Sequence, residues 1–460
     1  MLVAYFFPPT GGVSVARMLR TAEYLPRYGW EPIVVAPTSS GHAIQDAAGL
    51  AGILPDLRVI RTPCPEPAKL RRLVESRIDR RSSRAGNLQA SSPSAALAVS
   101  RPRRAAAQMS LLAGRFFFPD EQVVWLPFAV AAAVHAAREF GADAILSTSS
   151  PATAHLAAML ASRIVGIPWI ADFRDPWVGN ALEDDVPRAI AAMRRRLERR
   201  FIASAAELTF VTPSLTKRYQ KRYPGYADRM RTVAYGYDRR ERVEPIAHDP
   251  EHFTLVYAGP LWRPRELTVF LAGLQAAVTA EPGLSDRLRV RFVGSVTREC
   301  NALLQQAMAS AELASIIELV GQLPRGAALG HIQASDAALL LLPDGAGTEI
   351  IASGKLYDYI GRDRQVLAVV PQCEAAQVLR ELDWGVIVPP TVDGVAGGIR
   401  EVMAARPKRT VADPEGRFDW VNLTSLFAAA LNRAVTSRNA RSSGCARQGA
   451  DGDSRVEMVK

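Results

Sequence analysis

The chain has 460 residues, of which 48% are hydrophobic and 22% are charged, and its formal net charge at pH 7 is +10. This composition is ordinary for a soluble globular protein, and the length predicts two or three domains. The four cysteines lack metal-ligand spacing, which argues against a zinc site or a disulfide framework and favours a reducing compartment.

No apolar run reaches the ~18 residues that a membrane span needs, and the N-terminus lacks the features of a signal peptide, so a cytoplasmic location is expected. Positive charge is concentrated in two stretches. Residues 61–115 hold twelve Lys or Arg against three acids, and residues 188–222 hold ten against two. Such patches fit an anionic membrane surface or an acidic substrate as well as a solvated face. Nucleic acid is the weaker expectation, because no aromatic residues are interleaved with the arginines.

Short β-rich runs alternate with longer helical patterns in the first half of the chain. The expected strands cover residues 2–7, 31–37, 57–62, 142–149, 168–173 and 207–213. The expected helices cover residues 14–28, 123–140, 151–165 and 188–205. Near-continuous apolar strands that alternate with helices predict a parallel sheet covered on both faces.

The same alternation begins again after a polar stretch at residues 239–251. The expected strands here cover residues 253–259, 288–294, 315–321, 337–343, 365–370 and 384–389. The chain is therefore predicted to be an α/β protein with two doubly wound, Rossmann-like domains. The expected division is residues 1–244 with a mobile basic insertion near 71–104, residues 245–410, a helical segment at 411–435 and a disordered tail at 436–460.

Two prolines and two adjacent glycines follow the first expected strand, in the stretch FFPPTGGVSVAR at residues 6–17. Ligands of parallel α/β sheets bind outside the carboxyl ends of the strands, and glycine lets a backbone approach them closely. Gly11 and Gly12 stand at that edge, before a helix whose N-terminal amides attract anions. The spacing matches neither a dinucleotide fingerprint nor a P-loop, and a structural turn explains it equally well.

Basic residues follow two of the expected strands in the second half. Arg263 and Arg265 come after the first of these strands, where they either hold a diphosphate or are exposed loop residues. Gly354, Lys355 and Asp358 precede a later apolar strand. A lysine in the first turn of a helix opposes the helix dipole unless an anion lies nearby, so Lys355 indicates a bound anion.

Four stretches occur in order along the chain: FFPPTGGVSVAR, ADFRDPW at 171–177, YAGPLWRPRE at 257–266 and SGKLYDYIGRDRQVLAV at 353–369. Together they resemble the family 4 glycosyltransferases over most of residues 1–435. The resemblance implies the GT-B fold, in which two domains face a cleft and a last helix crosses back to the first domain. It also implies transfer of a sugar, with retention and without a metal or cofactor, from a nucleotide-sugar donor to a glycan or lipid-linked acceptor in cell-surface glycan synthesis.

The resemblance also assigns roles to individual residues. Arg265 stands where the family has a phosphate-binding lysine, and Arg263 supplies the charge that is missing at Pro260. Asp358 matches the second acid of the family's two-glutamate motif, which is expected at the donor ribose. The full assignment is Gly11, Gly12, Arg263, Arg265, Gly354, Lys355 and Asp358 for the donor, Arg17 and Arg174 for the acceptor side, and Asp172, Asp175 and Glu349 for catalysis.

Two features depart from the family's pattern. Ile350 occupies the place of the first acid of the two-glutamate motif, so Glu349 beside it becomes the candidate. The stretch ADFRDPW lacks a histidine that the family often has there, and Arg174 and Asp175 could simply pair with each other. Retention through the leaving phosphate and retention through a carboxylate nucleophile both stay open. A nucleotide-sugar 2-epimerase of the same fold and a catalytically silent GT-B binding protein are the alternative functions.

Overall fold

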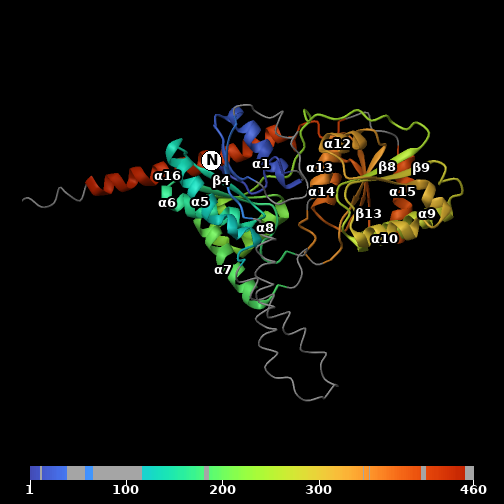
Figure 1. Ribbon diagram of the computed structural model, residues 1–460, viewed down its shortest axis with the longest axis horizontal. Helices are drawn as coiled ribbons and strands as arrows, with labels where there is room; N and C mark the ends of the chain where they lie inside the picture. The colour runs from blue at the N-terminus through green and yellow to red at the C-terminus, as the bar shows by residue number, and fades with distance from the viewer. Residues whose placement is uncertain are drawn as a thin grey trace, which may run out of the picture. The chain divides into compact units, whose positions relative to one another are not determined.

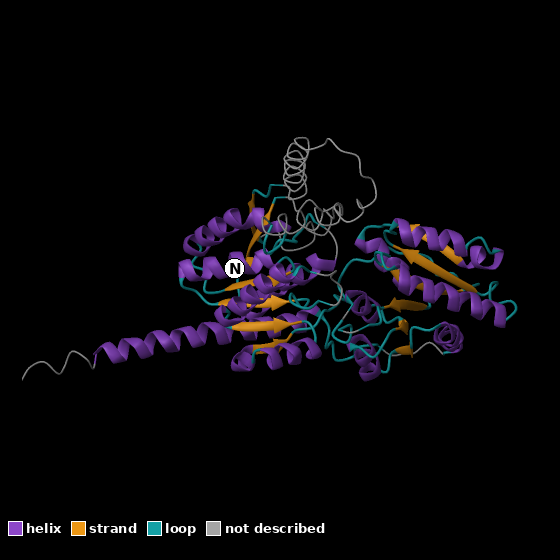
Figure 2. Cartoon of the chain, turned by 90° about the horizontal axis from the view of Figure 1, so that it is seen from below, coloured by secondary structure: helices purple, strands orange, loops and turns teal. Residues whose placement is uncertain are grey.

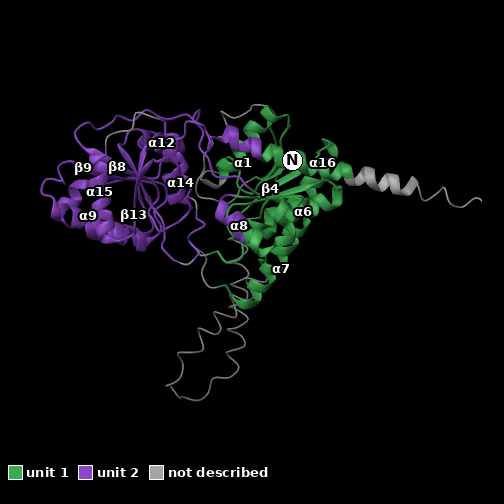
Figure 3. Cartoon of the chain, turned by 180° about the vertical axis from the view of Figure 1, so that it is seen from behind, with its two compact units in different colours: residues 1–210, 219–231, 427–460 green, residues 211–218, 232–426 purple. Residues whose placement is uncertain are grey.

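The computed structural model describes residues 1–10, 13–38, 57–65, 117–180, 186–345, 347–351, 353–405 and 411–450 (Figure 1). The chain divides into two compact units. Unit 1 comprises residues 1–210, 219–231 and 427–460, and unit 2 comprises residues 211–218 and 232–426 (Figure 3). The glycines at 11 and 12, the basic insertion expected near 71–104 and the last ten residues lie outside the described residues.

Unit 1 is built on a seven-stranded sheet with the order β3-β2-β1-β4-β5-β6-β7. β1 pairs in parallel with both β2 and β4, so the strand order reverses between β1 and β4. β2, β4 and β5 are buried along their whole length, as expected for apolar strands covered on both faces. The strands are β1 (Leu2–Val3), β2 (Ile33–Pro37), β3 (Arg58–Thr62), β4 (Ile145–Ser149), β5 (Trp169–Phe173), β6 (Glu207–Phe210) and β7 (Met230–Thr232).

Small side chains set the packing of the helices in unit 1. In α5 the buried face consists of alanines spaced by three or four residues, and it packs against α6, whose buried face is also rich in alanine. The helices before residue 211 are α1 (Val13–Tyr24), η1 (Leu25–Tyr28), η2 (Glu121–Trp125), α5 (Leu126–Glu139), α6 (Ala152–Val165) and α7 (Arg188–Ser204). α8 (Pro213–Arg222) begins in unit 2 and ends in unit 1, where η3 (Pro224–Arg229) follows it.

A histidine lies inside the core of unit 1. The imidazole of His155 on α6 is fully buried, and its Nδ1 lies 2.8 Å from Oγ of Ser147. The rings of Trp169, Phe173 and Phe201 surround it at centroid distances of 4.7–5.7 Å. Burial lowers the pKa of His155 to about 3, so this side chain is neutral in the folded protein.

Unit 2 holds a six-stranded sheet with the order β10-β9-β8-β11-β12-β13, and all of its neighbouring strands are parallel. The strands are β8 (Phe253–Ala258), β9 (Leu288–Val293), β10 (Ile317–Gly321), β11 (Ala337–Leu341), β12 (Gln365–Val369) and β13 (Gly385–Val388). Figure 2 shows the strands of both sheets between helices.

Two hydrophobic clusters fill the space between the sheet of unit 2 and its helices. One cluster joins the sheet to α9 (Pro264–Ala280), α10 (Arg298–Ala307), α11 (Ala311–Ile316) and α15 (Val392–Ala404). The other joins it to α12 (Arg325–Gln333), α13 (Gly354–Gly361) and α14 (Glu374–Leu382). Each strand thus lies between two helical layers, as the doubly wound prediction requires.

The division between the units differs from the expected boundary at residue 244. The polar stretch at residues 239–251 belongs to unit 2, and so do residues 232–238 before it. The amide of Tyr237 donates to the carbonyl of Phe418, and the amide of Glu244 donates to the carbonyl of Gly326. These backbone hydrogen bonds join residues that are far apart in sequence, so no local pattern reveals them.

The last helix, α16 (Trp420–Ala450), begins in unit 2 and continues in unit 1. Within unit 1, Phe427 lies under the guanidinium of Arg17, whose Cζ is 5.0 Å from the ring centroid. Arg433 forms an ion pair with Glu207 at 2.8 Å. The helix extends well beyond residue 435, where the sequence predicted disorder, up to residue 450 (Figure 1).

Candidate functional site

The strand orders place the candidate residues in both units. In open α/β sheets, ligands bind outside the carboxyl ends of the strands at the point where the order reverses. That point lies between β1 and β4 in unit 1 and between β8 and β11 in unit 2. The stretches that follow β8 and β11 carry Arg263, Glu349 and Lys355, and Arg174 after β5 donates to the carbonyl of Ser150, which follows β4.

The turn after β8 is shaped around a lysine. Gly259 has a φ of +130°, which side chains other than glycine rarely adopt, and a Cβ at this position would overlap Cε of Lys355. Glycine at 259 therefore allows α13 to bring its first-turn lysine directly onto the turn. The close packing of Lys355 thus explains why glycine stands at position 259 in this protein.

Lys355 is held by an aromatic side chain from β8. Its Nζ donates to the hydroxyl of Tyr257 and lies 4.2 Å from the ring centroid of that residue. The Tyr257 hydroxyl in turn donates to the carbonyl of Pro260 at 3.1 Å. Tyr257 thereby connects the lysine to the turn, and the sequence analysis did not single it out.

The electrostatics around Lys355 favour an anion. Burial, together with repulsion from Arg263, lowers the pKa of Lys355 from 10.5 to about 8. The same ammonium group stands in the first turn of α13, where the helix dipole is positive. A phosphate placed here would relieve both repulsions, because it supplies the negative charge that the cluster lacks. We call Tyr257, Gly259, Arg263 and Lys355 the basic cluster.

The two arginines predicted for the donor differ in their surroundings. Arg263 precedes α9, stacks on the ring of Trp262 with its Cζ at 4.1 Å, and lies 3.8 Å from Glu266. Arg265 is exposed on the first turn of α9. The structure therefore places Arg263 close enough to Lys355 for their charges to repel, and it leaves Arg265 at the surface. Gly354 begins the helix that carries Lys355.

Asp358 takes part in an ion network on unit 2. Its carboxylate accepts from both terminal nitrogens of Arg325, at 3.2 and 2.7 Å, and Arg325 also binds Glu241 at 2.6 and 2.9 Å. The network connects α12 and α13 to the segment before β8. The assignment of Asp358 to a donor ribose stays a prediction, and a ribose would share this carboxylate with Arg325.

The acid expected beside the sugar lies in the loop after β11. Glu349 is exposed, and its carbonyl accepts from the amide of Glu374 at 3.1 Å. Ile350 is 5% exposed, and its carbonyl accepts from the Thr212 hydroxyl at 3.3 Å. Within unit 2, Ile350 is therefore buried, whereas Glu349 beside it is exposed.

Two predicted residues of unit 1 pair with each other in its interior. Arg17 and Asp172 are both 0% exposed, and the guanidinium binds the carboxylate through two hydrogen bonds of 2.7 and 2.6 Å. The hydroxyls of Thr148 and Thr209 donate to the same carboxylate at 2.8 and 2.7 Å. Burial alone raises the pKa of Asp172, but Arg17 and these hydroxyls hold it below its ordinary value.

This arrangement differs from the expected placement of Arg17 and Asp172 at a substrate. A buried carboxylate with four hydrogen bonds has no remaining access to a ligand, so the pair joins α1 to β5. The geometry weighs against contact with substrate for either residue, and the assigned roles stay predictions.

The stretch after β5 carries the other two predicted site residues of unit 1, Arg174 and Asp175. Arg174 is 5% exposed, and its guanidinium donates to the carbonyls of Ser149 and Ser150 at 2.7 and 2.5 Å. It therefore fixes the loop between β4 and α6. Asp175 is exposed at the same edge, where its carboxylate faces solvent in part.

A buried acid that the sequence analysis passed over anchors the end of that stretch. Glu198 on α7 is 0% exposed and accepts from the amide of Val178 and from the hydroxyls of Tyr219 and Tyr223, at 3.1, 2.8 and 2.7 Å. Arg222 completes its charge pairing at 3.1 Å. The available signal was an acid on the apolar side of an arginine-rich helix, between buried Leu197 and Phe201.

Neither metals nor membrane spans are indicated by the described residues. No group of three or more His, Cys, Asp or Glu among them is placed to hold a metal ion. None of the helices in that part of the chain is long and apolar enough to cross a bilayer.

No protein-family model and no curated protein sequence matches this chain. Solved structures do. It is similar to a glycosyltransferase from Rickettsia africae ESF-5, with 12% identity, a TM-score of 0.54 and 95% of each chain covered. The Anabaena protein HepE in complex with UDP and glucose has 14% identity and a TM-score of 0.56, with 94% of this chain and 99% of that one covered.

A third similar structure is the lipopolysaccharide outer core galactosyltransferase WaaB, with 10% identity and a TM-score of 0.54. The similarity covers 95% of this chain and 99% of the WaaB chain. At such low identity these likenesses show the fold. The protein has the GT-B fold of two Rossmann-like domains, as the sequence predicted.

Proposed function

We propose that this protein is a glycosyltransferase that moves a sugar from a nucleotide-sugar donor to a glycan or lipid-linked acceptor, with retention and without a metal. The observation that carries the proposal is the basic cluster at the carboxyl edge of the unit 2 sheet. Two similar structures of the same fold are named as a glycosyltransferase and a galactosyltransferase, and a third, HepE, holds UDP and glucose. We therefore take UDP as the first nucleotide to test.

The basic cluster suits the charge that develops in such a reaction. When the bond between the sugar and the diphosphate breaks, negative charge grows on the leaving phosphate and positive charge on the sugar ring. Lys355, Arg263 and the N-terminus of α13 stabilise the negative charge on the leaving phosphate without a metal. The acceptor oxygen forms the new bond to the sugar, and its proton passes to the leaving phosphate or to a carboxylate such as that of Glu349.

Ligand binding and turnover test the proposal separately. UDP, GDP and ADP are compared by thermal shift, where a ligand at 100 times its dissociation constant stabilises the protein by about 2.7 kcal/mol. Hydrolysis of UDP-glucose and UDP-galactose is then followed by release of UDP. We expect stabilisation by one nucleotide and slow hydrolysis of its sugar. If no nucleotide shifts the unfolding temperature, the proposal is wrong.

A catalytically silent binder is the second candidate, because the buried Ile350 stands where the family has an acid. This candidate predicts nucleotide binding of normal strength with no release of UDP and no transfer. A 2-epimerase would instead convert the donor into an isomer of the same mass, which chromatography of the product distinguishes.

Peripheral attachment to an anionic membrane is part of the proposal. One side of α7 exposes five arginines, at positions 188, 195, 196, 199 and 200, and Met193 among them is 37% exposed. Vesicles with and without anionic lipid are compared at rising salt. We expect binding to anionic vesicles that weakens steeply with salt, and an α7 variant with glutamine at Arg195 and Arg199 should bind less. Equal binding to neutral vesicles would contradict this.

A further inference from the structure

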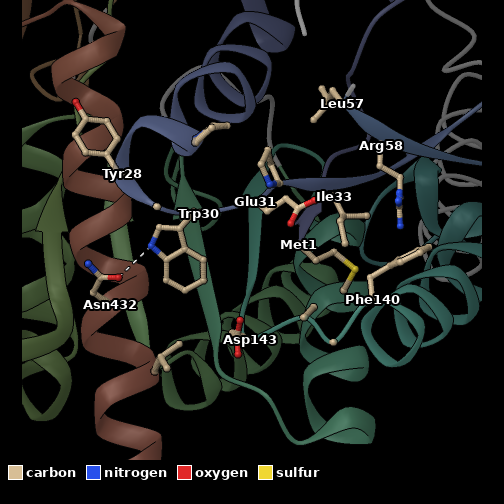
Figure 4. Close-up of a pocket in the computed structure, with 16 residues that line it drawn as sticks. Met1, Tyr28, Trp30, Glu31, Ile33, Leu57, Arg58, Phe140, Asp143 and Asn432 are labelled. Atoms are coloured by element: carbon tan, nitrogen blue, oxygen red, sulfur yellow. Dashed lines mark hydrogen bonds between the residues drawn. The ribbon is translucent and has the colours of Figure 1, made fainter. Parts of the chain in front are cut away.

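A cavity of about 680 Å³ lies at the opposite edge of the unit 1 sheet from the predicted acceptor side. Its lining includes Met1, Ile33, Arg58 and Asp143, which begin or precede β1, β2, β3 and β4. Asn432 of α16 completes one wall (Figure 4). The volume is within the range of ordinary small-molecule sites, and none of the residues assigned to donor or acceptor lines it.

A hydrogen bond to α16 holds the indole ring of Trp30 in place at this cavity. The indole Nε1 of Trp30 donates to Oδ1 of Asn432 at 3.0 Å, so the polar group of the tryptophan is satisfied and its ring is held in place. On the other side of the cavity, the guanidinium of Arg58 already covers the ring of Phe140 at 3.9 Å. Trp30 is therefore the better placed of the two rings to stack on a ligand.

Two carboxylates lie between these aromatic residues in Figure 4, those of Glu31 and Asp143. Both side chains are exposed, and the carboxylate of Asp143 lies close enough to the amino group of Met1 to favour the charged form of that group. The guanidinium of Arg58 and the amide of Asn432 add donors to these acceptors. The cavity thus offers a flat apolar surface together with both kinds of hydrogen-bonding group.

We propose that this cavity binds a neutral sugar unit of a glycan, stacked on Trp30 and hydrogen-bonded through its hydroxyls to Glu31 and Asp143. The C–H groups on one face of a sugar ring are weakly positive and suit the negative face of an indole. Hydroxyls both donate and accept, so they match carboxylates and an arginine at once. The two carboxylates outnumber the single guanidinium of Arg58, so the site disfavours an anion. The site goes beyond the proposed function, because binding here requires no donor and no turnover.

The test uses the full chain. The probes are methyl glycosides of glucose and galactose and disaccharides of these sugars, and ligand-observed NMR measures their binding. We expect binding in the millimolar range, weakened ~10-fold or more in Trp30→Ala and several-fold in a double variant with Glu31→Gln and Asp143→Asn. Phe128→Ala, which removes an exposed aromatic ring from α5, is the matched control and should bind as the wild type does. Both carboxylates are exposed, so the double variant retains the fold even if Trp30→Ala does not.

Saturating UDP separates this site from the donor site. The glycoside signals should persist in its presence, and they should persist also if the protein proves unable to turn over any donor. Absence of binding by every probe, or unchanged binding in the double variant, would overturn the proposal. Displacement of the glycosides by UDP would assign them to the donor site and would overturn it equally.

Discussion

The protonation of Lys355 should control nucleotide affinity near neutral pH. Its pKa of about 8 means that the amine is about 90% charged at pH 7 and about 10% charged at pH 9. If the diphosphate binds the ammonium form, the affinity for UDP falls ~10-fold over this range, which corresponds to about 1.4 kcal/mol. The phosphates of UDP are already ionised above about pH 7, so they contribute little to the change.

Titration calorimetry with UDP at several pH values measures this dependence. Lys355→Arg keeps the charge at all of these pH values and should show a flat profile, whereas Lys355→Met should bind weakly and also show a flat profile. Tyr257 and Arg263, the groups that face Lys355, stay in one charge state here, since the pKa of Tyr257 is raised and guanidinium is always charged. A flat wild-type profile, or the wild-type slope in Lys355→Met, would refute the reasoning.

Arg263→Ala is expected to weaken UDP binding ~10-fold or more, since a charge-assisted contact contributes roughly 1.5–3 kcal/mol, and Arg265→Ala should do less because that side chain is exposed on α9. Equal losses in calorimetry would place both arginines on the diphosphate. Asp358→Asn is expected to weaken UDP and UDP-sugar alike by roughly 10-fold, whereas Glu241→Gln disturbs the same ion network and should leave both affinities unchanged. If Asp358→Asn leaves the affinity for UDP unchanged, Asp358 belongs only to the ion network with Arg325 and Glu241. Burial lowers the pKa of His155 from 6.5 to about 3, so the folded protein holds this imidazole neutral. The stability that the neutral imidazole contributes is complete above about pH 6.5 and is lost as the pH falls toward 3. At pH 5 the free energy of unfolding should be lower by roughly 2 kcal/mol. Urea unfolding of the wild type and His155→Gln measures this, and identical pH slopes would contradict it.

The sequence predicted the strands well because most of them are continuous apolar runs between turn residues. β1 is shorter than the run at residues 2–7, although the amide of Ala4 still donates to the carbonyl of Val35 on β2 at 3.0 Å. β7 was not predicted, since three residues with two polar side chains carry no periodic signal. The apolar runs thus located all of the strands described here except β7, which lies at one edge of the unit 1 sheet.

The candidate site was predictable to the extent that its residues follow strands. Lys355 stood out because its position in a first turn conflicts with the helix dipole, and in the structure Arg263 adds a second positive charge near it. Arg17 and Asp172 looked equally functional, but 155 positions separate two residues that bind each other. Whether a polar residue meets a ligand or another residue is decided by tertiary contacts, which a single sequence does not contain.

The path of α16 has a consequence for the order of folding. Most of unit 1 precedes unit 2 along the chain, yet Phe427, which covers Arg17, and Arg433, which binds Glu207, follow unit 2. In a nascent chain, unit 1 therefore stays incomplete until the whole of unit 2 has been synthesised. Separately expressed segments ending near residue 231 should lack this cover, and a peptide spanning residues 420–440 supplied in trans should restore it.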